Sequence, residues 1–496
     1  MMDHDFYILY NSLLLSTGLE QEGRDHPAYL TFLIHSLIFR LVDFFQNSYT
    51  SNLDQLLSSS KIDLSLGFYF NISRVTNCFI NLFLLISFYE VLKKINIKRE
   101  LISLALLIFV ISNWYTLSFY ALRSENLSLL FVNLSLIHVL KKNNFILNYF
   151  IAGIFFGIAM FTKIQVLFFL LYILFFLLLG NYDNKKIQEK FSYNKFTKNY
   201  FIFSLLVIVF LYVFFQLKIQ EYPRFEKNRY LDLFIFILSF VSLFIFIFYY
   251  FRSNPKIIEK KYLLFSIFFN GFIFLILILI VLDFLKITPI NDFIYLRITN
   301  PVHYMSEFQS SFAEGSVNLN YIFNMIYKIF TSYSQSLIEL FIAITIFIYT
   351  FQRYLSLKNF NFFNFFNLFF LFFTFLFITS INSLREAPQY HIYYTFCYLI
   401  FVLSVLNNLD LKNSKLILTI IFIIFVSNNS LINNYDNSSD KMVSIFERKN
   451  SMIEMCKEFR YGIKPDVSDQ TLEYIRYWHL KFNNKVINSL CIELKI

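Results

Sequence analysis

The chain has 496 residues, of which 57% are hydrophobic, only 15% are charged and 69 are Phe. One water-soluble core cannot bury that much apolar surface, so the composition excludes a soluble globular fold and predicts that lipid solvates much of the chain. The formal net charge of +10 does not indicate nucleic acid as a partner, because Lys and Arg are expected in the cytoplasmic loops of a membrane protein.

Two stretches near the N-terminus have apolar positions at helical spacing that are interrupted by polar residues. They cover residues 6–17 and 27–46, and the interrupting residues include Asn11 and Arg40. This pattern predicts helices that lie in the membrane interface rather than span the membrane. Both belong to the segment 1–69, which precedes the first long apolar run.

The remainder of the chain is dominated by long apolar runs. A helix needs about 20 apolar residues to cross the hydrocarbon core of a bilayer. On that basis we expect about twelve membrane-spanning helices, at approximately 70–92, 101–116, 124–140, 146–162, 164–180, 200–217, 231–251, 262–286, 330–351, 361–380, 392–408 and 415–428. The fold class is therefore predicted to be an all-α polytopic membrane protein.

Basic residues collect in every second loop between these predicted spans. The basic loops are 93–99, 141–142, 185–198, 252–261 and 353–358. Lys and Arg accumulate on the cytoplasmic side of membrane proteins, so these loops are predicted to be cytoplasmic. The loop 221–229 is an exception, since it also carries basic residues but falls on the opposite side.

This topology predicts three parts of the chain. Residues 1–69 form an outer-face loop with the two interfacial helices, residues 70–428 form the transmembrane core, and residues 429–496 form a small soluble domain on the outer face. The loops 287–320 and 381–391 also fall on the outer face.

Charged residues near the outer ends of the predicted spans are the candidates for function. Charges are costly at membrane level, so those kept there are functional candidates by default. They come from five separate segments and are Asp3, Asp5, Asp25, His26, Arg123, Glu125, Lys163, Arg297, His303, Arg385, Glu386 and His391. Their number on one face predicts a single site there rather than unrelated anchors.

The N-terminal residues resemble the first outer loop of a known enzyme group. They read Asp3-His-Asp-Phe-Tyr7, then Asn11, Gly18 and Asp25-His26-Pro27. This order resembles the GT-C membrane glycosyltransferases, a group that contains the protein O-mannosyltransferases, the aminoarabinose transferase of lipid A and many bacterial relatives. In that group an acidic motif is followed by a Tyr, a small helix that ends in Gly, and an acidic or basic residue before Pro.

Three further segments agree with this resemblance. Ala121-Leu-Arg-Ser-Glu125 resembles the second outer loop of the family, with its acid at the head of a span. Gly157-Ile-Ala-Met-Phe-Thr-Lys163 resembles its Gly-to-Lys segment, and Tyr390-His-Ile-Tyr-Tyr394 resembles its late tyrosine-rich outer turn. The resemblance covers the ordered layout of the whole membrane part.

The resemblance implies an inverting transfer of a sugar from a polyprenyl-phosphate donor to a lipid, glycan or protein acceptor, at the outer face of a bacterial plasma membrane. Such a transfer needs a carboxylate that takes the proton of the acceptor hydroxyl, and Asp3 matches the family base. Glu125 would orient the acceptor or share that work, with Asp5 as a further partner. No cofactor is required, although Asp3 and Asp5 are suited to a divalent cation.

The leaving phosphate needs cations that are already in place as its charge grows. The resemblance implies that they come from the outer-face residues, which together with Asp25 form the expected binding set for substrate and lipid phosphate. The set is Asp25, His26, Lys163, Arg297, His303, Arg385 and His391.

Other functions stay open at this point. A transporter or lipid-sugar flippase would place ionisable groups near the bilayer midplane, whereas the predicted midspans here are nearly pure Phe, Leu and Ile. A glycan ligase or polymerase also uses outer loops and a lipid-linked donor. The family has a spanning helix before the acidic motif, where this chain begins, so an inactive GT-C-like protein without that helix is a further alternative.

Overall fold

The structure is a computed structural model, which describes residues 3–18, 28–46, 49–52, 55–56, 62–112, 115–116, 119, 122–141, 145–163, 166, 169–173, 264–265, 267–272, 274–275, 278, 334–356, 370–376, 391–408 and 414–432. The regular elements in these ranges are helical, and no β-strand occurs among them. The longer helices are α1 (Asp3–Ser16), α2 (Tyr29–Phe45), α4 (Ile62–Lys94), α5 (Arg99–Ile111), α7 (Ser124–Val139), α8 (Phe145–Thr162), α16 (Ser334–Ser356), α18 (His391–Asn408) and α19 (Ser414–Ile432).

Most helices coincide with runs that the sequence singles out. The two helices predicted at 6–17 and 27–46 are confirmed as α1 and α2. Helices are also present at seven of the predicted spans, as α4, α5, α7, α8, α16, α18 and α19. The predicted spans 164–180, 262–286 and 361–380 are described only in part. The spans 200–217 and 231–251, and all but the first residues of the predicted domain 429–496, lie outside the described residues.

The beginning of α4 and the end of α5 differ from the predicted boundaries. Helix α4 begins at Ile62, within the segment assigned to the outer loop, and its first turns pack against α1 and α2. Helix α5 ends at Ile111 instead of continuing to residue 116. At its end Ser112 has an extended backbone with ψ of 138°, and its hydroxyl donates to the carbonyl oxygen of Phe109 over 2.6 Å. The same hydroxyl accepts from the amide of Tyr115 over 3.3 Å, as an N-cap serine does, so Ser112 separates α5 from the turn that follows.

Helix α4 contains the one segment of the described residues that is long and apolar enough to cross a membrane, Gly67–Lys94, with 28 residues. At about 1.5 Å per residue this segment exceeds the hydrocarbon thickness of about 30 Å. One face of α4 exposes large apolar side chains at helical spacing, namely Val75, Phe79, Leu82, Phe83 and Ile86, each more than half exposed. An apolar stripe of this size is not stable against water and indicates an apolar surrounding.

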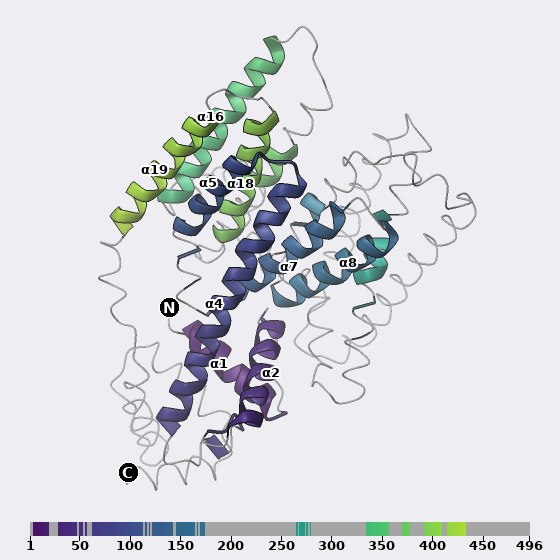
Figure 1. The fold of residues 1–496 in the computed structure, drawn as a ribbon, viewed down its shortest axis with the longest axis vertical. Helices are drawn as coiled ribbons and strands as arrows, with labels where there is room; N and C mark the ends of the chain where they lie inside the picture. The colour runs from purple at the N-terminus through teal and green to yellow at the C-terminus, as the bar shows by residue number, and fades with distance from the viewer. Residues whose placement is uncertain are drawn as a thin grey trace, which may run out of the picture.

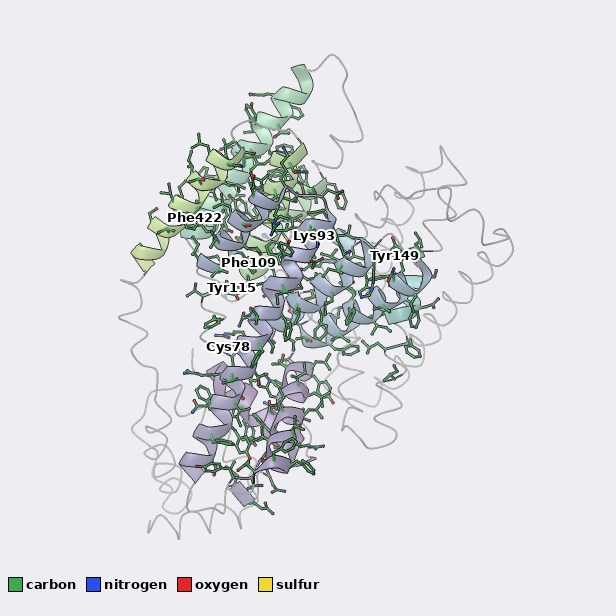
Figure 2. All side chains as sticks on the ribbon, viewed as in Figure 1. Cys78, Lys93, Phe109, Tyr115, Tyr149 and Phe422 are labelled. Carbon is green, nitrogen blue, oxygen red and sulfur yellow. The ribbon has the colours of Figure 1, made fainter. Side chains whose placement is uncertain are left out.

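The helices gather in two groups along α4. Helices α1 and α2 lie beside its N-terminal half, whereas α5, α16, α18 and α19 lie on the side of its C-terminal half (Figure 1). Cys78, near the middle of α4, lies between the two groups (Figure 2). Helices α7 and α8 form an antiparallel hairpin that packs on α4, and Tyr149 of α8 donates to the carbonyl oxygen of Val139 over 3.2 Å.

The end of the bundle at the C-terminus of α4 collects segments that the sequence assigns to one side of the membrane. Asn407, near the end of α18, donates to the carbonyl oxygen of Asn96 over 3.1 Å and accepts from the amide of Lys98 over 3.3 Å. Lys415, at the start of α19, forms an ion pair with Glu100. The topology predicted from the basic loops assigns all of these positions to cytoplasmic ends.

Helix α8 approaches the segment 267–272 so closely that glycine is required on both sides. A Cβ added at Gly153 would meet the carbonyl oxygen of Phe268, and one added at Gly271 would meet that of Phe150. A Cβ added at Gly157, four residues after Gly153, would meet side-chain atoms of Phe272 and Leu275. Small residues at this spacing let helix backbones touch in a membrane, where dispersion replaces the hydrophobic effect as the cause of association.

We predict that Gly153→Leu destabilises the fold strongly, because the neighbouring atom is backbone and cannot rotate away. The expected loss is about 1–3 kcal/mol or more. It is measured as a lower unfolding temperature of the detergent-solubilised protein and as aggregation on size exclusion. Gly67→Leu is the matched control, because a Cβ at that helical glycine meets no atom of the described residues within 4 Å. Equal behaviour of the two variants would contradict the close approach of α8 and 267–272.

Candidate functional site at the ends of α7, α8 and α18

The first turn of α7 is buried, although it is polar. Arg123 precedes the helix in an extended conformation, with φ of −137° and ψ of 135°, and Ser124 and Glu125 follow in the first turn. Glu125 is favourably placed there, since the N-terminus of a helix carries partial positive charge. All three residues are at most 4% exposed. Buried groups of this polarity need partners, so their contacts define a site.

Lys163 supplies the partner of Glu125. It follows directly after the end of α8, where its amide donates to the carbonyl oxygen of Ala159 over 2.8 Å. Its Nζ lies 3.0 Å from Oε1 of Glu125, and the two side chains are 3% and 2% exposed. The pair therefore joins the end of α8 to the beginning of α7. Lys163 is also stabilised by the partial negative charge at the C-terminus of α8.

Arg123 adds a second cation to this pair. It is 4% exposed, and its Nε is buried without a hydrogen-bond partner in the part of the chain that the structure describes. The guanidinium interacts electrostatically with Glu125, as Lys163 does. Two cations thus share the carboxylate of Glu125 within this buried trio.

Helix α18 contacts the same end of α7 through a tyrosine. The hydroxyls of Ser128 and Tyr393 are 2.6 Å apart, and Ser128 donates to the backbone carbonyl oxygen of Glu125 over 2.7 Å. On another face of α7, Asn126 donates to the side-chain oxygen of Asn81 of α4 over 2.6 Å. The residues around Glu125 are therefore held by α4, α7, α8 and α18 at once.

The helix that carries the acidic motif belongs to the same packing unit. Ile8 of α1 shares one apolar cluster with Leu122, which precedes Arg123, and with Phe161, which lies two residues before Lys163. Asp3 and Asp5 belong to the first turn of α1, and their side chains lie outside the described residues. The structure thus connects α1 to the segments that flank the ion pair.

The remaining predicted site residues are not described. His391 is the first residue of α18, but its side chain lies outside the described residues. Six other positions lie outside them entirely, which are Asp25, His26, Arg297, His303, Arg385 and Glu386. Among the residues that were searched, no group of three or more His, Cys, Asp or Glu side chains could hold a metal ion. The predicted divalent cation between Asp3 and Asp5 falls outside those residues.

A second buried carboxylate is not among the predicted site residues. Glu339 of α16 is 0% exposed, and its Oε1 accepts a hydrogen bond of 2.7 Å from the hydroxyl of Thr395. Tyr398, one turn further along α18, interacts electrostatically with Glu339, and its buried hydroxyl has no hydrogen-bond partner among the described residues. The sequence does contain a signal, because an acid within a predicted span is a functional candidate.

Comparison of the whole chain with protein-family models, with curated proteins and with solved structures finds no match.

The ion pair allows a test of the site by double substitution. Removal of one partner of a buried pair leaves an uncompensated charge, which costs about 3–5 kcal/mol. We therefore expect Lys163→Met alone and Glu125→Leu alone each to lower the free energy of unfolding in detergent. Each loss should be far more than half of the loss measured for the double variant. The exposed pair of Lys93 and Glu90, at 3.3 Å, is the control, where Lys93→Met costs about 0.5 kcal/mol or less. Additive effects at Glu125 and Lys163 would refute their coupling.

Proposed function

We propose that the chain is a polytopic membrane glycosyltransferase of the GT-C type. It moves a sugar from a polyprenyl-phosphate donor to a lipid, glycan or protein acceptor at the outer face of a bacterial plasma membrane. The observation that carries the proposal is the buried trio of Arg123, Glu125 and Lys163. It occupies two segments whose sequences resemble that group, and α1, with the acidic motif in its first turn, packs beside them.

The membrane setting is supported by the distribution of exposed apolar side chains. Helix α4 has the length to span a bilayer and exposes an apolar stripe. Helices α16 and α19 expose similar residues, which include Phe341, Ile348, Leu416 and Ile423. We propose about twelve spans, with the first turns of α7, α16 and α18 at the outer face.

The two cations of the trio suit the phosphate of the donor. The guanidinium of Arg123 offers a planar fork of donors that matches phosphate oxygens, and Lys163 offers a point charge. Both are buried, so their attraction for an anion is screened little by water. As the bond between the anomeric carbon and the phosphate oxygen breaks, these two cations stabilise the charge that develops on the leaving polyprenyl phosphate.

Asp3 is the proposed general base. The acceptor hydroxyl attacks the anomeric carbon from the side opposite to the phosphate, and its proton passes to the carboxylate of Asp3, so the configuration inverts. Glu125 is engaged by Lys163 at 3.0 Å, which makes it a weak proton acceptor. Its proposed role is to hold both cations in place and to orient the acceptor. Asp5 is a further partner of the base.

A second candidate function is transport of a lipid-linked sugar. It is favoured by one observation, the complete burial of Glu339 within α16 and its hydrogen bond to Thr395 of α18. Transporters place ionisable groups inside their helix bundles, at the interface of moving elements.

We predict that Arg123→Ala lowers sugar transfer at least about 100-fold, as expected for the loss of a buried donor that stabilises developing charge. Arg123→Lys restores only part of the rate, because it keeps the charge and loses the fork. Asp3→Asn abolishes transfer at unchanged protein level. The assay is transfer from radiolabelled polyprenyl-phosphate sugars in membranes that carry the protein.

Arg74→Ala is the matched control for these variants. Arg74 lies on α4, its guanidinium lies 4.5 Å from the ring centre of Phe70, and its side chain is exposed. It should leave transfer unchanged. If wild-type membranes transfer no label from any donor while the protein is present and folded, the glycosyltransferase proposal fails. Glu339→Gln is then compared with wild type in vesicle uptake of the same lipid-linked sugars.

A further inference from the structure

Helix α2 carries a buried histidine that the proposed reaction does not use. His35 is 2% exposed, and its ring lies edge-on to Phe39, with the ring centres 6.4 Å apart. Its Nδ1 lies 2.7 Å from the carbonyl oxygen of Thr31, one turn earlier in α2. A carbonyl oxygen only accepts hydrogen bonds, so Nδ1 carries a proton and donates it. In the neutral imidazole, Nε2 is then a bare acceptor.

The contact of this ring with α4 contains polar atoms that lack partners. The backbone of Ser73 of α4 lies beside the ring of His35. Nε2 of His35, Oγ of Ser73 and Oγ1 of Thr31 are all buried without a hydrogen-bond partner among the described residues. Unsatisfied buried polar atoms are destabilising. The packing of α2 on α4 is therefore weak at this place even when His35 is neutral.

A second proton would turn His35 into a cation inside this contact. Burial lowers the pKa of His35 from its usual value of 6.5, and the hydrogen bonds to the backbone of Thr31 and Ser73 offset this effect only in part. A buried cation is tolerated when a carboxylate lies beside it, so the charged groups around His35 decide the outcome.

The described charged side chains of α2 and of the first half of α4 are engaged elsewhere. Arg40 donates to two carbonyl oxygens at the C-terminal end of α1, over 2.6 and 3.0 Å. Asp43 accepts from the hydroxyl of Tyr69 and from a backbone amide. Arg74 is exposed and lies over an aromatic ring of its own helix. Neither helix therefore supplies a described carboxylate to His35.

Helices α1 and α8 supply no counterion either. The described side chains of α1 are uncharged, and Tyr10 stays neutral there because burial raises its pKa. Helix α8 contains no charged residue, and Lys163, which follows it, pairs with Glu125 at 3.0 Å. Among the described residues, no carboxylate interacts with the ring of His35. A proton on this ring is therefore uncompensated as long as α2 stays packed.

We propose that the contact between His35 of α2 and Ser73 of α4 is a proton-sensitive device that controls how firmly α2 packs on α4. The neutral ring allows packing, whereas its protonation favours a state in which α2 moves away and water reaches the ring. Helix α1 follows α2, because Arg40 joins the two helices, so acid loosens the helix that carries Asp3 and Asp5. This inference does not depend on sugar transfer.

The direction of the pH dependence follows from the lowered pKa. In the open state the ring is in water and binds a proton near pH 6.5, more readily than in the packed state. The packing is therefore fully stable above about pH 6.5 and weakens as the pH falls below that value. Between pH 7.5 and pH 5.5 the equilibrium constant for opening should rise by up to about tenfold.

The test is hydrogen–deuterium exchange of the full chain in detergent at pH 7.5 and pH 5.5, followed by mass spectrometry. Protection factors are corrected for the intrinsic exchange rate at each pH. In the wild type, we expect those of peptides within α2 to fall about five- to tenfold at pH 5.5. Peptides of α18, which lies toward the other end of α4, should keep their protection (Figure 1).

His35→Leu and His35→Gln should each abolish this fall, because neither side chain binds a proton in this range. The two variants differ in polarity, since Gln keeps a donor and Leu does not, so a packing defect of one does not decide the result. His138→Gln is the matched control. His138 is a partly buried histidine of α7 whose Nδ1 lies 3.3 Å from Oδ1 of Asn148, and its replacement should leave the fall at α2 unchanged.

Two outcomes would overturn the proposal. One is a wild type whose α2 peptides are equally protected at both pH values. The other is a fall of the same size in the wild type and in both His35 variants, because another group then causes the opening.

Discussion

The ion pair of Lys163 and Glu125 closes the α7–α8 hairpin at the end opposite to its connecting loop. Two charges at 3.0 Å that are almost fully buried tolerate little separation, since each would then be left in an apolar surrounding. Because both residues sit at helix ends, the pair fixes the relative height of the two helices. The other contacts of the site follow from this arrangement. At the same end of α7, Ser128 contacts Tyr393 of α18 and Asn126 contacts Asn81 of α4.

Polar residues inside the bundle are paired across helices. Asn133 of α7 donates to the hydroxyl of Ser87 of α4 over 3.0 Å, and Ser135 donates to the carbonyl oxygen of Ala152 of α8 over 2.8 Å. In an apolar surrounding such bonds specify which helix faces meet, since apolar contacts alone are similar on every face. The same principle applies around α2, where Arg40 donates to the carbonyl oxygen of Leu15 of α1 and Asp43 accepts from the hydroxyl of Tyr69 of α4.

The sequence predicts helices well where an apolar run is long and uninterrupted. Helices α7, α8, α18 and α19 agree with the predicted runs within a few residues, because the composition of these segments permits no other regular structure in lipid. The early end of α5 coincides with the extended backbone of Ser112, whose hydroxyl accepts from the amide of Tyr115, and composition does not reveal this cap. The predicted number of spans and their topology go beyond what the described residues test.

The candidate site is predictable in its members but not in its geometry. Arg123, Glu125 and Lys163 stand out in the sequence because they are charged residues at the outer ends of predicted spans. That Glu125 and Lys163 pair, while the Nε of Arg123 has no hydrogen-bond partner among the described residues, follows only from the positions of the side chains. Glu339 escapes prediction because it lies in the long apolar run 330–351, whose pattern predicts a span despite a single acid.

The contact of Gly153 and Gly271 acts as a pivot for α8. The backbones touch there, so any change of the crossing angle turns α8 about this point instead of shifting it sideways. Lys163 lies ten residues from Gly153, a lever arm of about 15 Å. A rotation of about 5° would therefore move the end of α8 by about 1.3 Å, a shift that the Lys163 side chain must absorb to keep its contact with Glu125. The close backbone contact at Gly153 and Gly271 thus limits the crossing angle of α8, and this limit fixes the position of Lys163 in the charged trio.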